Sequence, residues 1–167
     1  VVDPRYSRSA ARADIYARIR PGSDLAFYGG LINYILQNDL FQKEYVLHYT
    51  NAACLLRPDF KFDVDHGLFS GWDPETKRYD NETWGYDVEH KAVWDTSEGS
   101  AFAWVNRPGT PKFKTPDLKV LKRDMTLQDP NCVLNVMKRH YARYTPELVT
   151  RVTGMDPDVM KKVWEVF

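Results

Sequence analysis

The first 24 residues constrain the fold most, because an acidic residue ends a short apolar run and a glycine-containing loop then opens a helix. Residues 1–2 are typical of the end of a buried strand, and Asp3 follows them directly. In doubly wound α/β folds, an acid at the carboxyl end of a strand reads the ribose hydroxyls of a nucleotide. The loop at 21–24 precedes an amphipathic segment, and helix N-termini behind such loops bind anions. The segment therefore predicts half of a nucleotide cradle.

The composition is that of a water-exposed globular segment. The chain has 167 residues and zero formal net charge, with a mean hydropathy of −0.53. That length is enough for one domain with a core. Neither a signal peptide nor an apolar run long enough to span a membrane is apparent. The sequence starts with Val1 and ends inside an apparent helix at Phe167, so we expect an internal piece of a longer polypeptide.

Charge is unevenly distributed along the chain. Residues 1–20 hold five arginines against Asp3 and Asp14, a balance of +3. Residues 59–98 hold eleven acids against four bases, a balance of −7. No basic patch dominates, so we expect no nucleic-acid partner. The basic N-terminal segment suits a phosphorylated ligand, and the alternative is a set of solvated surface arginines.

Local patterns predict the elements. We expect a helical turn over 9–14 and a β-like segment over 15–20. A helix is expected over 24–37, capped by Ser23 or Asp24. Asp39 with Gln42 predicts a capping box for a helix over 40–48, and an extended piece follows over 51–56. Three further helices are predicted, each beginning at a capping residue followed by proline, at 129–130, 145–146 and 156–157.

These patterns predict an α/β fold, part of a doubly wound Rossmann-like cofactor-binding domain that is rich in helix. Residues 1–56 are assigned to the first part of that domain, and residues 130–167 to its helical return. Residues 57–129 have poor periodicity and many prolines and glycines, yet aromatic residues punctuate them. A disordered linker would lack such residues. We therefore expect a long, irregular, ordered insertion anchored on another surface.

No catalytic or metal-binding constellation is apparent in the sequence. Four histidines are scattered at 48, 66, 90 and 140, and the loop around His66 lacks the spacing of a calcium site. Cys54 and Cys132 have no metal or redox spacing and are expected to be buried thiols. We therefore expect a ligand cradle and no catalytic residue in this chain.

Each cradle residue has a predicted role. Asp3 would accept hydrogen bonds from ribose hydroxyls, whereas Arg5 and Ser7 would meet phosphate or base. Gly22 would allow close backbone approach, and Asp24 would accept two N–H donors from a guanine edge. The alternatives are a turn role for Asp3 and a plain helix cap for Asp24. The full predicted cofactor site is Asp3, Pro4, Arg5, Tyr6, Ser7, Gly22, Ser23 and Asp24.

Two stretches, 1–14 and 19–26, resemble the molybdopterin oxidoreductase superfamily of the dimethyl sulfoxide reductase type. In that family, the corresponding loops contact a guanine dinucleotide of the bis-molybdopterin cofactor. Residues 143–147 (RYTPE) and 152–154 (VTG) match another family segment. Serine stands at positions 7, 9 and 23, where the family often has threonine, so the hydroxyl is kept. The resemblance implies a cofactor site built from these loops.

Further stretches restrict the resemblance to one group of the superfamily. Respiratory formate dehydrogenase α (major) subunits carry an insertion that is similar to residues 65–73, 77–80 and 129–133. The resemblance implies an internal fragment of an enzyme that oxidises formate to carbon dioxide in a two-electron reaction. The whole subunit would carry bis-molybdopterin guanine dinucleotide with molybdenum or tungsten, a selenocysteine or cysteine ligand, and a 4Fe-4S cluster outside this fragment. Alternatives are another family member, such as a nitrate or polysulfide reductase, or a catalytically empty interaction module.

The resemblance also implies partners and a location. The fragment alone would be inactive and would pack against the remainder of its own catalytic subunit. That subunit would bind an iron–sulfur electron-transfer subunit and a membrane cytochrome subunit. The complex would be periplasmic and membrane-associated, with any export signal upstream of Val1.

Overall fold

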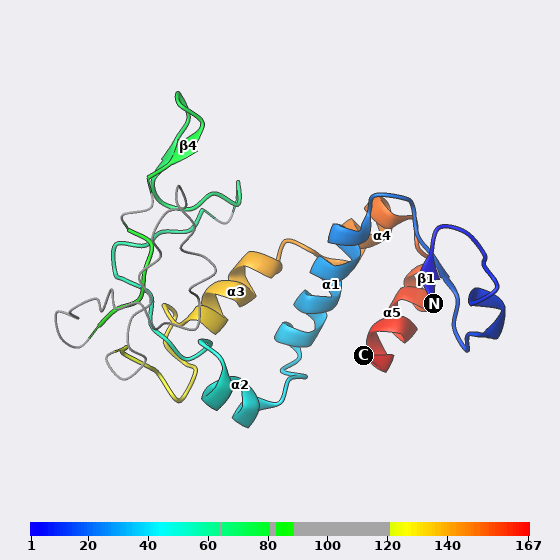
Figure 1. The fold of residues 1–167 in the computed structure, drawn as a ribbon, viewed down its shortest axis with the longest axis horizontal. Helices are drawn as coiled ribbons and strands as arrows, with labels where there is room; N and C mark the ends of the chain where they lie inside the picture. The colour runs from blue at the N-terminus through cyan, green and yellow to red at the C-terminus, as the bar shows by residue number, and fades with distance from the viewer. Residues whose placement is uncertain (64, 81–82, 89–120) are drawn as a thin grey trace, which may run out of the picture.

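The computed structural model describes residues 1–63, 65–80, 83–88 and 121–167. Its elements run along the chain as shown in Figure 1. They are β1 (Val2–Asp3), the 3-10 helix η1 (Ala10–Arg12), β2 (Ala17–Arg18), α1 (Asp24–Gln37), α2 (Lys43–Tyr49), β3 (Trp72–Asp73), β4 (Arg78–Tyr79), α3 (Val133–Tyr141), α4 (Pro146–Thr153) and α5 (Pro157–Val166). Within the described part of the chain, no helix has the length and apolar character needed to cross a membrane.

β1 and β2 pair in parallel, with Val2 opposite Ala17 and Asp3 opposite Arg18. The strand predicted over 15–20 is reduced to two residues, while the turn predicted over 9–14 is the short helix η1. Because the strands are parallel, their carboxyl ends meet at the same edge. The pairing brings the loop after Asp3 beside the loop that leads into α1. Two strands define no winding order, so the doubly wound topology stays a prediction.

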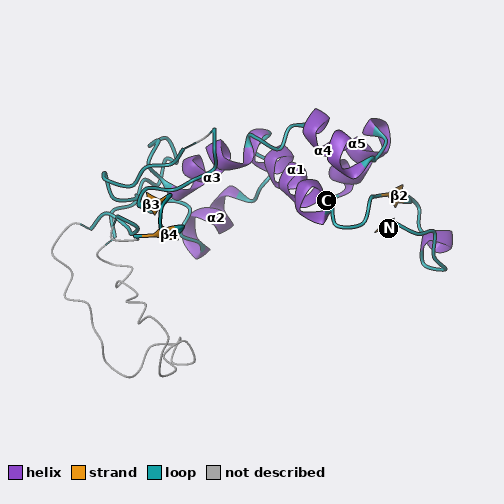
Figure 2. Ribbon diagram, turned by 90° about the horizontal axis from the view of Figure 1, so that it is seen from above, coloured by secondary structure: helices purple, strands orange, loops and turns teal. Residues whose placement is uncertain are grey.

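The first core joins β2, α1, α4 and α5, which lie together at one end of the molecule (Figure 2). Phe27, Val149 and Trp164 are among its buried side chains. Helix α1 approaches α4 and α5 closely at Gly30, where a Cβ atom would lie 2.5 Å from Val149 Cγ2. This core fixes α1, whose N-terminus borders the predicted cofactor loops.

The second core lies under α2 and α3. Leu36, Leu127 and Leu134 pack together in it. These three leucines come from the three predicted segments, residues 1–56, 57–129 and 130–167. The extended piece predicted over 51–56 is present only at 54–56, where Leu55 forms an antiparallel bridge with Cys132 and Leu56 forms one with Tyr86, whereas residues 51–53 form a turn. The bridge from Leu56 ties the described part of residues 57–129 to the first segment, and the bridge from Leu55 joins the first segment to the last.

Aromatic side chains of the described insertion cluster around Phe69. Its ring centroid lies 5.5 Å from that of Phe62, 5.7 Å from that of Trp84 and 6.2 Å from that of His140 on α3. The aromatic residues at positions 94, 102, 104 and 113 lie outside the described residues, as does His90. Anchoring of the insertion on another surface stays a prediction.

The last two helices begin as the sequence predicts. Thr145 Oγ1 accepts a hydrogen bond from Leu148 N at 3.3 Å and Pro146 takes the first turn of α4. That helix ends at Gly154, which has a left-handed φ of 67°. Asp156 caps α5 by accepting from Asp158 N at 3.0 Å.

Two predicted helix starts are wrong. Helix α3 begins at Val133, because Asp129 Oδ1 accepts a hydrogen bond from Asn131 N and forms a turn there. The capping box at Asp39 is absent from α2, whose N-cap is Gln42 with no side-chain cap bond. Asp39 instead has a φ of 53° and pairs with Lys138 Nζ at 2.6 Å. At Asp39 the ion pair takes the carboxylate that a cap would need, whereas the Asp129 carboxylate caps a turn that ends before α3 begins.

Candidate functional site

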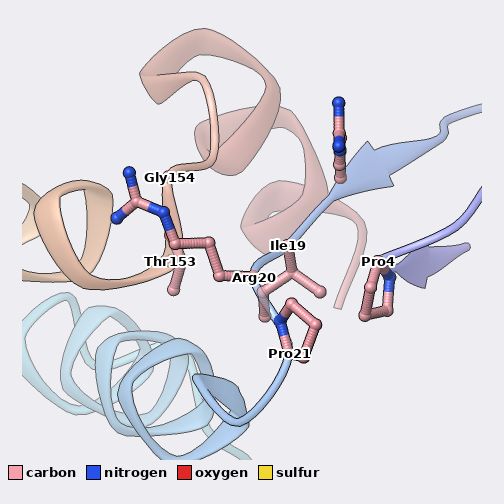
Figure 3. A pocket seen from close by; sticks show the side chains of 7 residues that line it. Pro4, Ile19, Arg20, Pro21, Thr153 and Gly154 are labelled. Atoms are coloured by element: carbon pink, nitrogen blue, oxygen red, sulfur yellow. The ribbon is translucent and has the colours of Figure 1, made fainter.

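A pocket of about 360 Å³ opens at the carboxyl edge of β1 and β2. Two predicted loops meet here, since Pro4 follows β1 and Pro21 precedes α1 (Figure 3). The end of α4 forms the opposite wall. The complete lining is Pro4, Arg18, Ile19, Arg20, Pro21, Thr153 and Gly154. The pocket therefore joins segments from the two ends of the chain.

The first loop is held by its own side chains. Asp3 Oδ1 accepts a hydrogen bond from Arg5 N at 2.7 Å, so the turn role considered for this carboxylate is present. The Tyr16 hydroxyl donates to Asp3 O at 3.1 Å, and the Tyr6 ring packs edge-on against Tyr16. Ser7 Oγ accepts from Ala10 N at 3.3 Å and starts η1. These bonds order the loop and leave Pro4, Arg5 and Tyr6 exposed.

The second loop turns sharply at Gly22, whose φ of 78° favours glycine. A Cβ atom here would meet nothing within 4 Å, so the space beside the backbone is open. Ser23 is buried, and its hydroxyl donates to Arg20 O at 2.6 Å. Ser23 is the N-cap residue of α1, as predicted, but its side chain makes no capping bond because the turn uses that hydroxyl. Asp24 is exposed on the first turn of α1.

Sequence reasoning missed most of the pocket. Among the eight predicted cofactor residues only Pro4 lines it, and the others flank it on the two loops. Arg18 and Arg20 are exposed, whereas Ala17 and Ile19 between and beside them are buried. Alternation of this kind is the period-two pattern of a strand. This alternation in the sequence was the signal that Arg18 and Arg20 lie on the same exposed face of the segment predicted over 15–20.

Other titratable groups lie away from the pocket. Asp63 Oδ2 and His66 Nδ1 are 2.9 Å apart, and this pairing raises the pKa of His66. The hydrogen bond from the His66 backbone N–H, followed by the same side-chain pairing, lowers the pKa of Asp63. Burial raises the pKa of both thiols, Cys54 and Cys132. In the ranges that the structure describes, no three His, Cys, Asp or Glu side chains are grouped to hold a metal ion.

Comparison with known proteins covers almost the whole chain, although no family model matches it. It is 40% identical over 165 residues to the formate dehydrogenase major subunit of Haemophilus influenzae. It is 39% identical over 165 residues to the formate dehydrogenase-O major subunit of Escherichia coli. It is 37% identical over 166 residues to formate dehydrogenase 2 subunit alpha (cytochrome c-553) of Nitratidesulfovibrio vulgaris.

Each of these alignments covers 99% of this chain but only 13% or 14% of the relative. The resemblance predicted from residues 65–73, 77–80 and 129–133 is thereby confirmed. Along nearly its whole length, the chain is homologous to one segment of the formate dehydrogenase major subunits.

Proposed function

We propose that this chain forms one wall of the dinucleotide-cofactor site in the catalytic subunit of a formate dehydrogenase. The observation that carries the proposal is the meeting of two loops and two arginines at the carboxyl edge of a parallel strand pair. Ligands of α/β proteins bind at that edge of the sheet. The whole enzyme would oxidise formate to carbon dioxide.

The pocket suits the phosphate-bearing part of a dinucleotide in size and charge. Its volume of about 360 Å³ lies within the range of roughly 300–1,000 Å³ that is common for ligand sites. Arg18 brings a guanidinium to the lining, and such groups bind phosphate oxygens in pairs. The open space beside Gly22 allows a ligand to approach the backbone. The residues present therefore suit a phosphate-bearing portion of bis-molybdopterin guanine dinucleotide.

Within this site, the chain's residues would bind and orient the cofactor. Asp3 would accept from ribose hydroxyls through its second carboxylate oxygen, while Arg5, Ser7 and Arg18 would contact phosphate. Asp24 would accept from the N–H groups of guanine. When bound, the cofactor supplies the molybdenum or tungsten centre that takes two electrons from formate. The protein's part is to hold and orient that group.

The remaining chemistry belongs to other parts of the polypeptide and to its partners. Cys54 and Cys132 are the two cysteines of the sequence, and in the described ranges no three His, Cys, Asp or Glu side chains are grouped to hold a metal ion. We therefore assign the selenocysteine or cysteine ligand and the 4Fe-4S cluster to segments outside this chain. An iron–sulfur subunit, a membrane cytochrome subunit and a periplasmic site complete the proposal.

The test uses Asp24→Ala in the full-length enzyme. We expect less guanine nucleotide and less molybdenum or tungsten per subunit, because the carboxylate that recognises guanine is gone. Glu44→Ala is the matched control, since Glu44 also lies in the first turn of a helix but is on α2. Metal and nucleotide contents equal to those of the wild type in the Asp24 variant would contradict the proposal.

A further inference from the structure

A single arginine satisfies most of the C-terminal end of α4. A helix leaves its last four carbonyl groups without donors from its own backbone. In α4, Arg20 Nη1 donates to Arg151 O at 2.7 Å and to Val152 O at 3.2 Å. The Arg20 backbone N–H donates to Thr153 O at 2.8 Å, and Gly154 N donates to Thr150 O at 2.8 Å. All four terminal carbonyls are therefore bonded, and three of them depend on Arg20.

The same arginine shapes the loop before α1. Ser23 N donates to Arg20 O at 3.3 Å, and Ser23 Oγ donates to the same oxygen at 2.6 Å. The backbone of Arg20 thus closes the turn that carries Gly22, while its side chain reaches the end of α4 (Figure 3). The loop and the helix are fixed to each other through one residue, although they lie 131 residues apart in the sequence.

The position of Arg20 at the end of α4 changes the charge that the pocket presents to a ligand. The C-terminal end of a helix carries a partial negative charge of about half an electron. In this chain that end faces the pocket, because Thr153 and Gly154 line it. An anionic ligand would be repelled by uncovered carbonyl groups. The guanidinium of Arg20 lies over them and packs so closely on Gly154 that a Cβ atom there would lie 3.0 Å from Arg20 Cζ.

We propose that Arg20 is a positioning residue for an anionic, phosphate-bearing ligand of this pocket. It neutralises the negative end of α4 and holds residues 21–24 in the conformation that receives the ligand. The inference rests on the proposed function, because that function supplies the phosphorylated ligand. It adds a residue that acts through the α4 terminus and the loop, separate from the residues that would touch the ligand.

The test compares Arg20→Gln and Arg20→Lys in the full-length enzyme, with Arg12→Gln as the matched control. Arg12 is an exposed arginine of the same basic segment. Guanine nucleotide released by acid, and molybdenum or tungsten, are measured per subunit. We expect Arg20→Gln to lower both by about tenfold, the typical effect of losing a charge-assisted hydrogen bond. Arg20→Lys should restore most of the content because it keeps the cation, and Arg12→Gln should match the wild type.

Hydrogen exchange separates positioning from general stability. On enzymes produced without the cofactor, Arg20→Gln should speed exchange in residues 19–27 and leave residues 52–56 of the second core unchanged. Equal acceleration in both segments would overturn the inference, as would wild-type cofactor content in Arg20→Gln. A wild-type enzyme that holds no guanine nucleotide would instead refute the proposed function itself. The two failures are therefore distinguishable.

Discussion

The packing of α1 predicts that Gly30→Ala destabilises the chain, although alanine favours helix more than glycine does. The added Cβ atom would lie 2.5 Å from Val149 Cγ2 and 2.7 Å from Trp164 Cζ2. Carbon atoms in contact prefer roughly 3.5–4.0 Å, so α4 and α5 must both move by about 1 Å. Val149 and Trp164 are buried at 0% and 4% exposure, which leaves them little room to relax.

Two opposing contributions decide how much Gly30→Ala changes the free energy of unfolding. Replacing glycine by alanine inside a helix gains about 1 kcal/mol. Overpacking a core costs about 1–3 kcal/mol, and a contact with two buried side chains on different helices places Gly30→Ala at the upper end. The expected net loss in the free energy of unfolding is therefore about 2 kcal/mol. Steric cost thus outweighs helix propensity at this position.

The assay is equilibrium urea unfolding of the 167-residue polypeptide, followed by tryptophan fluorescence. Val149→Ala provides the matched test, because it removes the nearest clashing methyl group. In a double-mutant cycle, Gly30→Ala with Val149→Ala should be more stable than the two single losses added together. Wild-type or higher stability of Gly30→Ala, or simple additivity in the double variant, would refute the packing argument.

Two further predictions concern groups outside the pocket. Hydrogen bonds from Thr126 and from the following backbone lower the pKa of Asp124 to about 2, so its contribution to stability is present above its ordinary pKa and is lost as pH falls from about 4 to 2. When the urea midpoint is plotted against pH, Asp124→Asn should remove the fall in stability between about pH 4 and 2. A curve identical to that of the wild type would contradict this role of Asp124. Cys54 and Cys132 should remain reduced under mild oxidant, because Leu55 is the residue paired with Cys132 and neighbouring strand residues face opposite sides. Formation of an intramolecular disulfide, detected by a mass loss of about two hydrogens, would refute this.

The candidate site shows where sequence reasoning stops. Residues 1–24 predict two ligand loops, and the structure places both at one strand edge. The pocket between them also needs Thr153 and Gly154, which no local pattern in that stretch reveals. Asp39 shows the same limit, since its sequence predicts a cap while a lysine on α3 takes the carboxylate. Ser23 is a further case, because its hydroxyl is used inside the turn.

The sequence by itself determined the elements whose signals are local. Helices α4 and α5 follow from a capping residue, a proline and, for α4, a terminal glycine, all within a few residues. The resemblance to formate dehydrogenase major subunits likewise follows from short runs of adjacent residues. Only the tertiary structure decided which loops meet and that Arg20 covers the end of α4. The physical reason is that capping depends on neighbouring backbone groups, whereas a pocket depends on packing between segments that the chain keeps far apart.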